Sequence, residues 1–196
     1  MPSNLSSADM QRSMHGAATG AATGAAKGEL PAGALVQSDA GEESYLKFRL
    51  EANVPAALAV RSVQEAFLLP ARQLTAMPNM PAPVLGLTNR RNQVVWVLDL
   101  AQLLGIAVFD AATVQYSILL IQVGLVQVGL AVRQIEGMVK IAADAVQSPI
   151  GQMSLALLPY LQGCALLKQG QTQEILLLLD AEAILQAPVM QNSLPA

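Results

Sequence analysis

The sequence predicts an all-β fold, and three observations support this prediction. Apolar runs of about four to eight residues, the length of ordinary strands, recur from residue 45 to residue 179. Glycine, proline and asparagine separate the runs, as turn residues do. No long amphipathic helix alternates with the runs, which disfavours a doubly wound α/β fold. Many short strands with few helices are typical of β-barrels or a β-sandwich.

Residues 1–43 do not follow this pattern. They contain no Phe, Trp or Tyr, and a tetrad ending in glycine occurs three times in a row at residues 17–28. Such glycines oppose helix formation by about 1 kcal/mol each, and alanine methyl groups are too small to offset the chain entropy lost on folding. We predict a disordered Ala/Gly/Ser/Thr-rich tail over residues 1–43 and a second, short tail over residues 188–196.

We call residues 44–187, between the two tails, the body of the chain. Its first half is predicted to hold several short elements. Proline disfavours helix in the segment 78–83, so the runs on either side of it are predicted as strands. Asp99 follows a β-branched run and is expected to cap a short helix that ends at Gly105. In chain order, the elements are strands at 45–50 and 57–60, a helical turn at 62–67, strands at 74–77, 84–88 and 94–98, and a helix at 100–104.

The stretch 114–132 carries no charge and is long enough to cross a bilayer, which needs about 20 apolar residues. However, Gln115, Gln122 and Gln127 would each leave amide groups in hydrocarbon. Gly124 divides the stretch into two strand-length pieces that are rich in Val and Ile. We therefore predict a buried β-hairpin of residues 116–123 and 125–132, and no insertion into a membrane.

The last part of the body repeats the pattern. The run 175–179 is wholly apolar, as in a strand that is buried on both faces. Asp180 follows it and is expected to start a helix that continues through Leu185 and is closed by Pro188. Further strands are predicted at 138–141 and 163–167.

The charge of the chain is concentrated in its tail. The whole chain has a net charge of −3 and a pI near 5.1, which argues against a nucleic-acid partner. The first 43 residues hold two basic and five acidic residues, so the rest has nine of each and is neutral. Such a body has little electrostatic resistance to docking, although a neutral domain that simply stays soluble explains the pattern equally well.

The sequence lacks the motifs of common enzymes. It has no P-loop, GxGxxG, GxSxG or HExxH motif, and its single histidine, His15, lies in the tail. Cys164 sits in an apolar run and is predicted to be a buried small hydrophobe. Asp180 and Glu182 diverge at a helix start, where a capping role is favoured over a catalytic pair. For Trp96, core packing and an exposed anchor remain equally open. We predict a binding module without enzyme activity, metal or cofactor.

The most distinctive segment is residues 86–100. Arg90 and Arg91 occupy a predicted tight turn between two apolar strands, and Asn92 suits a turn because it tolerates positive φ. An ordinary solvated hairpin tip is one interpretation. The other is a rigidly presented guanidinium that recognises a protein.

This segment resembles the CheW family of chemotaxis coupling proteins. The family pattern is approximately Gly-aliphatic-x-Asn-Leu-Arg-Gly-x-aliphatic-aliphatic-Pro-aliphatic-aliphatic-Asp-Leu. The resemblance extends over residues 44–187 and includes, in the family's order, 63–65, 129–132, 160–163 and 175–180. The chain departs from the pattern at Arg90, Asn92, Trp96 and Arg133, where the family has Leu, Gly, Pro and Asp. The residues of the segment that match in register are Gly86, Asn89, Arg91, Val94, Val95, Asp99 and Leu100.

The resemblance implies two intertwined five-stranded SH3-like β-barrels with short helices, and no catalytic activity. It implies a cytoplasmic adaptor that couples the cytoplasmic tip of a chemoreceptor to the regulatory domain of a CheA-type histidine kinase, in a chemotaxis or phototaxis array. The alternative is a CheW-like scaffold of a type IV pilus motility pathway. By position, Arg91, Asn89, Val63 and Glu65 fall on elements for receptor contact and kinase control, with Arg90 as a further partner-binding candidate.

Overall fold

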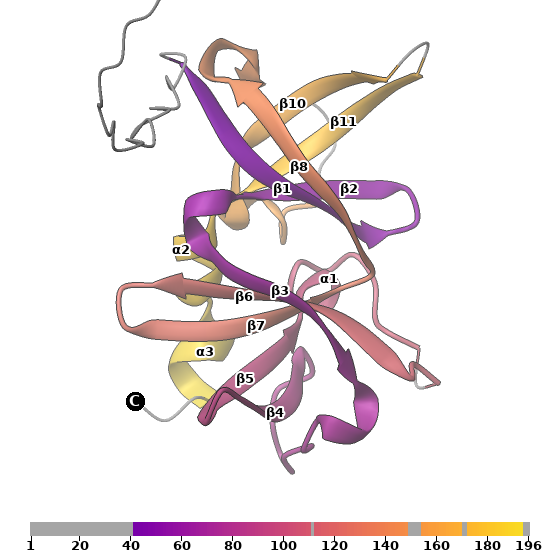
Figure 1. Ribbon diagram of the computed structural model, residues 1–196, viewed down its shortest axis with the longest axis vertical. Coiled ribbons are helices and arrows are strands. Elements are labelled where there is room, and N and C mark those ends of the chain that lie inside the picture. Colours follow the sequence, from indigo (N-terminus) through magenta and orange to yellow (C-terminus); the bar gives the residue numbers. More distant parts are fainter. Residues whose placement is uncertain (1–40, 111, 149–153, 170–171, 194–196) are drawn as a thin grey trace, which may run out of the picture. The chain divides into compact units, whose positions relative to one another are not determined.

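The computed structural model describes residues 41–110, 112–148, 154–169 and 172–193, all within one compact unit, Ser38–Ala196. The tail predicted over residues 1–43 lies outside the described residues except for its last three, and Glu42 and Glu43 already belong to the first strand. Two curled β-sheets and short helices make up the described part (Figure 1), which confirms the all-β prediction.

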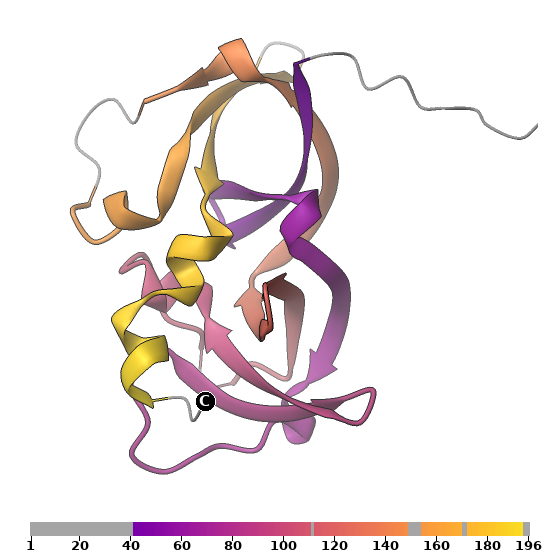
Figure 2. The same cartoon turned by 90° about the vertical axis from the view of Figure 1, so that its left-hand side faces the viewer.

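The first sheet takes its strands from both ends of the body. Its order is β8–β1–β2–β11–β10–β9, and its neighbours are antiparallel except for β2 and β11. Figure 2 shows the sheet curling into a ring. Its strands are β1 (Glu42–Glu51), β2 (Val54–Ala59), β8 (Gln134–Ala142), β9 (Val146–Gln147), β10 (Leu161–Gln169) and β11 (Thr172–Leu179).

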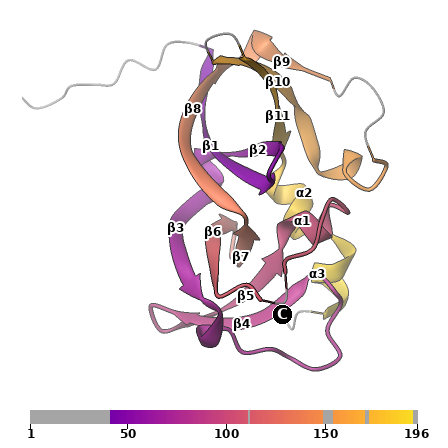
Figure 3. The ribbon, with the colours of Figure 1, turned by 90° about the vertical axis from the view of Figure 1, so that its right-hand side faces the viewer.

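The second sheet comes from the middle of the chain, in the order β3–β6–β7–β5–β4. The chain leaves the first sheet after β2 and returns to it at β8, so the two sheets are intertwined as the resemblance implied (Figure 3). The first sheet has six strands rather than five, because the two-residue β9 extends its edge. The strands of the second sheet are β3 (Val63–Pro70), β4 (Val84–Arg90), β5 (Gln93–Asp99), β6 (Gln115–Val123) and β7 (Val126–Val132).

The described helices are all short, and two of them have the predicted caps. Asp99 accepts the backbone N–H of Gln102 at 3.0 Å, and Asp180 accepts that of Glu182 at 2.8 Å. Within the described residues, no helix is long and apolar enough to cross a membrane. The α-helices are α1 (Leu100–Leu103), α2 (Ala181–Leu185) and α3 (Pro188–Ser193), and the 3-10 helices are η1 (Val60–Ser62), η2 (Ala71–Gln73), η3 (Ala143–Ala145) and η4 (Leu158–Tyr160).

Three segments differ from the predictions. The helical turn predicted over residues 62–67 is wrong: Ser62 ends η1, and residues 63–67 belong to β3, which pairs with β6 and alternates in exposure as a strand does. The strand predicted at 74–77 is reduced to a single bridge between Thr75 and Leu87, since prolines follow it directly. Residues 188–193, assigned to a short tail, form α3, in which Met190 is buried.

The uncharged stretch 114–132 forms the predicted hairpin. Gln122 pairs with Gln127, and Val123 pairs with Val126 at the ends of β6 and β7. Gly124 occupies the turn with a φ of +61°.

Three apolar clusters form the core. One belongs to the first sheet and includes Tyr45 and Leu178, and one belongs to the second sheet with its loops and includes Ile118. The third joins the sheets, since it combines Phe48 of β1 with Leu119 of β6 and with residues of the α-helices. Each sheet therefore buries part of its apolar surface only against the other, so the two should unfold together.

Candidate partner-binding site

The β4–β5 turn presents the two arginines singled out in the sequence. Arg90 pairs with Gln93 at the strand ends, so Arg91 and Asn92 alone make the turn. Their φ angles are +50° and +65°, as in a type I′ turn, whose twist matches that of the strands. Asn92 adopts the positive φ expected of it. The same conformation at Arg91 is not predicted by the sequence pattern, and it is a strained one for a long side chain.

A glycine fixes the direction of this hairpin. Thr75 and Leu87 exchange two backbone hydrogen bonds of 2.7 and 2.8 Å, which hold the loop against β4. A Cβ atom at Gly86 would lie 2.2 Å from the carbonyl oxygen of Thr75, and Gly86 has a φ of +142°. Only glycine permits this approach, so the match of Gly86 to the family pattern has a steric reason.

Glu65 on β3 meets both arginines of the turn. The Nε of Arg90 donates to Glu65 Oε2 at 3.2 Å, and its Nη2 contacts the other carboxylate oxygen. The Arg90 guanidinium also lies 4.4 Å from the centre of the Phe67 ring. Because β3 and β4 are the two outer strands of the second sheet, this contact joins its edges. Hydrogen bonding to Arg90 is the main reason that the pKa of Glu65 lies below its usual value.

The two arginines differ in how they are held. The Arg91 side chain is 76% exposed and its Nη2 is 3.4 Å from Glu65, whereas the Arg90 side chain is 35% exposed. Arg90 is clamped between a carboxylate and an aromatic ring, and Arg91 keeps most of its donors toward solvent. Counting the described residues alone, the local charge is one positive in excess. This arrangement suits Arg91 for binding an anionic group on a partner.

Glutamines extend the site across the second sheet. A cavity of about 160 Å³ is lined by Glu65, the two arginines and amide side chains. Gln127 Nε2 donates to Gln64 Oε1 at 2.8 Å, and Gln64 in turn donates to Gln122. None of these glutamines was predicted to be part of the site. The predicted hairpin was enough to infer that Gln122 lies opposite Gln127. The sequence contains no signal that β3 brings Gln64 next to them.

The remaining two predicted site residues lie outside this cavity. Asn89 is exposed on β4, opposite Val94, which is 68% exposed. Val63 is half-buried and packs against the cluster that joins the two sheets. The structure thus brings Glu65, Arg90 and Arg91 together, with Asn89 on the same hairpin and Val63 facing the core.

The first sheet contains a second group of charges, which was not predicted. Lys47 Nζ lies 2.9 Å from Glu136 and 2.6 Å from Glu174, while Arg49 contacts the same two carboxylates at 2.5 and 2.6 Å. The Lys47 side chain is only 8% exposed and the other three are 21–23% exposed. Two bases and two acids therefore form a closed, half-buried network.

Other residues that could carry chemistry are buried or structural. Cys164 is 8% exposed, as predicted for a small hydrophobe, and burial raises the pKa of its thiol. Trp96 is half-buried. Asp180 is a helix cap. Among the described residues, no group of His, Cys, Asp and Glu is arranged to hold a metal ion.

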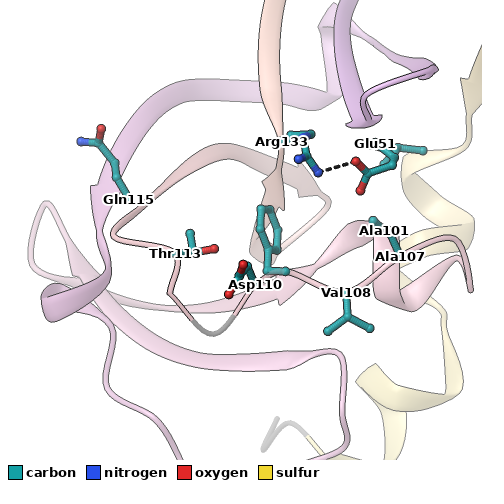
Figure 4. A pocket seen from close by; sticks show the side chains of 10 residues that line it. Glu51, Ala101, Ala107, Val108, Asp110, Thr113, Gln115 and Arg133 are labelled. Carbon is teal, nitrogen blue, oxygen red and sulfur yellow. Dashed lines mark hydrogen bonds and ion pairs between the residues drawn. The ribbon is translucent and has the colours of Figure 1, made fainter.

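A separate cavity of about 220 Å³ lies where the end of β1 meets the loop that follows α1 (Figure 4). Leu50, Ala107 and Phe109 provide apolar lining. Glu51 and Arg133 form an ion pair at its rim.

Comparison with known proteins places the chain in a family. A family model described as a CheW-like domain matches residues 44–189. Among solved structures, the chain is similar to the crystal structure of the scaffolding protein TtCheW from Thermoanaerobacter tengcongensis, with 19% sequence identity and a TM-score of 0.59. That match covers 70% of this chain and 88% of the other, and at this identity it shows a shared fold. No curated protein matched the chain.

Proposed function

We propose a function from the premise that this chain belongs to the CheW-like domain family. It is a chemotaxis-type signalling adaptor without catalytic activity. It works in the cytoplasm, where it couples the cytoplasmic tip of a chemoreceptor to the regulatory domain of a CheA-type histidine kinase. Arg91 is the centre of the partner-binding surface, which Arg90, Glu65 and Asn89 share, while Val63 packs the start of β3 against the core and so supports Glu65.

The observation that carries this proposal is the unmatched charge at the β4–β5 turn. In the first sheet, Lys47 and Arg49 face two carboxylates, but in the second sheet Arg90 and Arg91 face only Glu65 among the residues that the structure describes. A carboxylate from a partner would complete the second group. Such a charge-assisted contact is about twice as strong as a neutral hydrogen bond and fixes orientation as well.

The surroundings of Arg91 suit a contact of this kind. The type I′ turn and the Thr75–Leu87 bridge hold the backbone, so less flexibility is lost on binding. The clamped Arg90 keeps Glu65 turned away from solvent, with a side chain that is 19% exposed, and Arg91 remains available. An adaptor that contacts two partners through differential contacts can shift the populations of kinase states.

Replacing Arg91 tests the proposal. The variant Arg91→Glu places a like charge against the partner carboxylate, and we expect at least about a tenfold loss of affinity for a cognate receptor tip, measured by pull-down or titration. The matched control is Arg72→Glu, because Arg72 is another exposed arginine of the same half of the body. Unchanged binding by Arg91→Glu would remove the basis of the proposed site.

The same assay distinguishes the two signalling pathways. The chain would be titrated against each receptor tip and each CheA-type regulatory domain of its source organism. We expect the tightest pair to belong to a chemotaxis array. A preference for the kinase of a pilus motility pathway would replace that assignment with the alternative one.

A further inference from the structure

The cavity beside α1 combines an apolar interior with acidic groups. Leu50 and Ala107 line it with aliphatic surface, and Phe109 adds an aromatic ring that is held edge-on by Tyr116 at 5.1 Å between ring centres. The Glu51–Arg133 pair lies at the rim, where β1 ends and β7 passes into β8 (Figure 4).

The unbalanced charge at this cavity is negative. Glu51 is paired with Arg133, but Asp110 has no cationic partner among the described residues, and its Oδ1 accepts only the backbone N–H of Ala112 at 2.8 Å. A second carboxylate lies behind the lining: the fully buried Asp99 accepts the backbone N–H of Phe109 at 3.1 Å. The cavity therefore favours a cation.

The size of the cavity limits what can enter it. Its volume is about 220 Å³, whereas cofactors and drug-sized ligands occupy pockets of roughly 300–1,000 Å³. A single long side chain is a better fit. Lysine and arginine place an aliphatic stem along apolar surface and keep the charged head in a polar environment, which is the distribution found here.

We propose that this cavity receives one lysine or arginine side chain of a protein partner, with the stem against Leu50, Ala107 and Phe109 and the cationic head at Asp110. The site shares no lining residue with the cavity at Arg91. The β4–β5 turn and α1 lie at opposite ends of β5 (Figures 2 and 3). The protein thus has two separate contact points of opposite preference, one for an acid and one for a base.

The test is a titration of the full chain with tripeptides whose two ends are blocked. Binding is monitored through the amide chemical shifts of the protein in NMR spectra. Gly-Arg-Gly and Gly-Lys-Gly are the probes, and Gly-norleucine-Gly and Gly-Glu-Gly are the comparison peptides. We expect saturable shifts at Ala107 and Asp110 with the two basic peptides only. Asp110→Asn should weaken the binding of the basic peptides about threefold to fivefold, as for other partly solvated ion pairs.

The matched control is Asp144→Asn. It removes an exposed carboxylate on η3, which follows β8 of the first sheet. It should leave the titration unchanged. Equal shifts with the norleucine peptide would show an apolar slot without charge preference and would overturn the proposal. So would tighter binding of Gly-Glu-Gly, which would assign the site to Arg133, or an absence of shifts with every peptide. Each outcome is independent of receptor binding through Arg91.

Discussion

The two sheets each use an ion-pair group to connect strands that do not pair with one another. In the first sheet, Lys47 and Arg49 of β1 join Glu136 of β8 to Glu174 of β11, and the charges balance. In the second, Glu65 joins β3 to the end of β4 at Arg90, and the charges do not balance.

This difference supports the proposal that the first group is structural and that the second binds a partner. The balanced network is half-buried, so each charge has its partner where water is scarce. The unbalanced group lies at a hairpin tip, where the guanidinium of Arg91 is solvated. The first group should therefore matter mainly for stability, and the second mainly for recognition.

Lys47→Met should have the largest effect on stability. Lys47 is the least exposed member of the balanced network, and its removal leaves two carboxylates facing Arg49 alone. We expect the free energy of unfolding to fall by about 2 kcal/mol, measured by urea denaturation. Arg90→Met in the second group should lower it less, because that pair is more solvated.

The control for this substitution is Lys140→Met, since the Lys140 side chain is 66% exposed and 3.9 Å from Glu42. It should change the free energy of unfolding by less than about 0.5 kcal/mol. If Arg90→Met and Lys47→Met lowered the free energy of unfolding equally, the structural role could not be assigned to the Lys47 network alone.

Lowering the pH should have the second-largest effect on stability, because it weakens the balanced network of Lys47, Arg49, Glu136 and Glu174. Hydrogen bonding to Lys47 is the main factor that lowers the pKa of Glu174. For Glu136, burial alone would raise the pKa, but hydrogen bonds from Arg49 and Lys47 outweigh it. Because both folded-state pKa values lie below the usual 4.5, the stabilisation is fully present above that pH. It is lost as the pH falls through the folded-state values.

Urea midpoints measured from pH 7 down to pH 3 check this expectation. Glu174→Gln should flatten the loss of stability below about pH 4.5. Glu182→Gln is the control, because Glu182 is an exposed carboxylate on α2. If the stability of Glu174→Gln fell with pH as steeply as that of the unmodified protein, other groups would dominate the response to acid.

A substitution in the β4–β5 turn should cause the smallest change in the free energy of unfolding, and this change should be an increase. Replacing Arg91 and Asn92 by Asn and Gly installs the residues that type I′ turns prefer. Relief of the positive φ at Arg91 should raise the free energy of unfolding by up to about 1 kcal/mol. The same variant should lose receptor binding, which would show that Arg91 is kept for recognition despite its strain.

Asn79→Gly, at another asparagine with positive φ, is the matched control, and it should leave receptor binding intact. A loss of stability in the Arg91/Asn92 double variant would instead mean that the contact between Arg91 and Glu65 holds the turn in place.

Local patterns predicted much of the fold. Asp99 and Asp180 were recognised as helix caps, and Gly124 as the turn of a hairpin, because each depends on residues close by in the sequence. The β3 strand is not predicted, since residues 63–67 have no decisive local signal and become a strand by pairing with β6. For the site, the turn with Arg90 and Arg91 was predictable for the same local reason as the caps.

The sequence by itself determined the all-β class, the arginine turn and the family to which the chain belongs, since these follow from short-range patterns and from motifs in a fixed order. Only the tertiary structure decided which charges meet. Lys47 and Glu174 are 127 residues apart, and Arg90 and Glu65 are 25 apart on strands that do not pair. The physical reason is that the curvature of each sheet brings these side chains together, and curvature arises from the packing of the whole sheet rather than from any one strand.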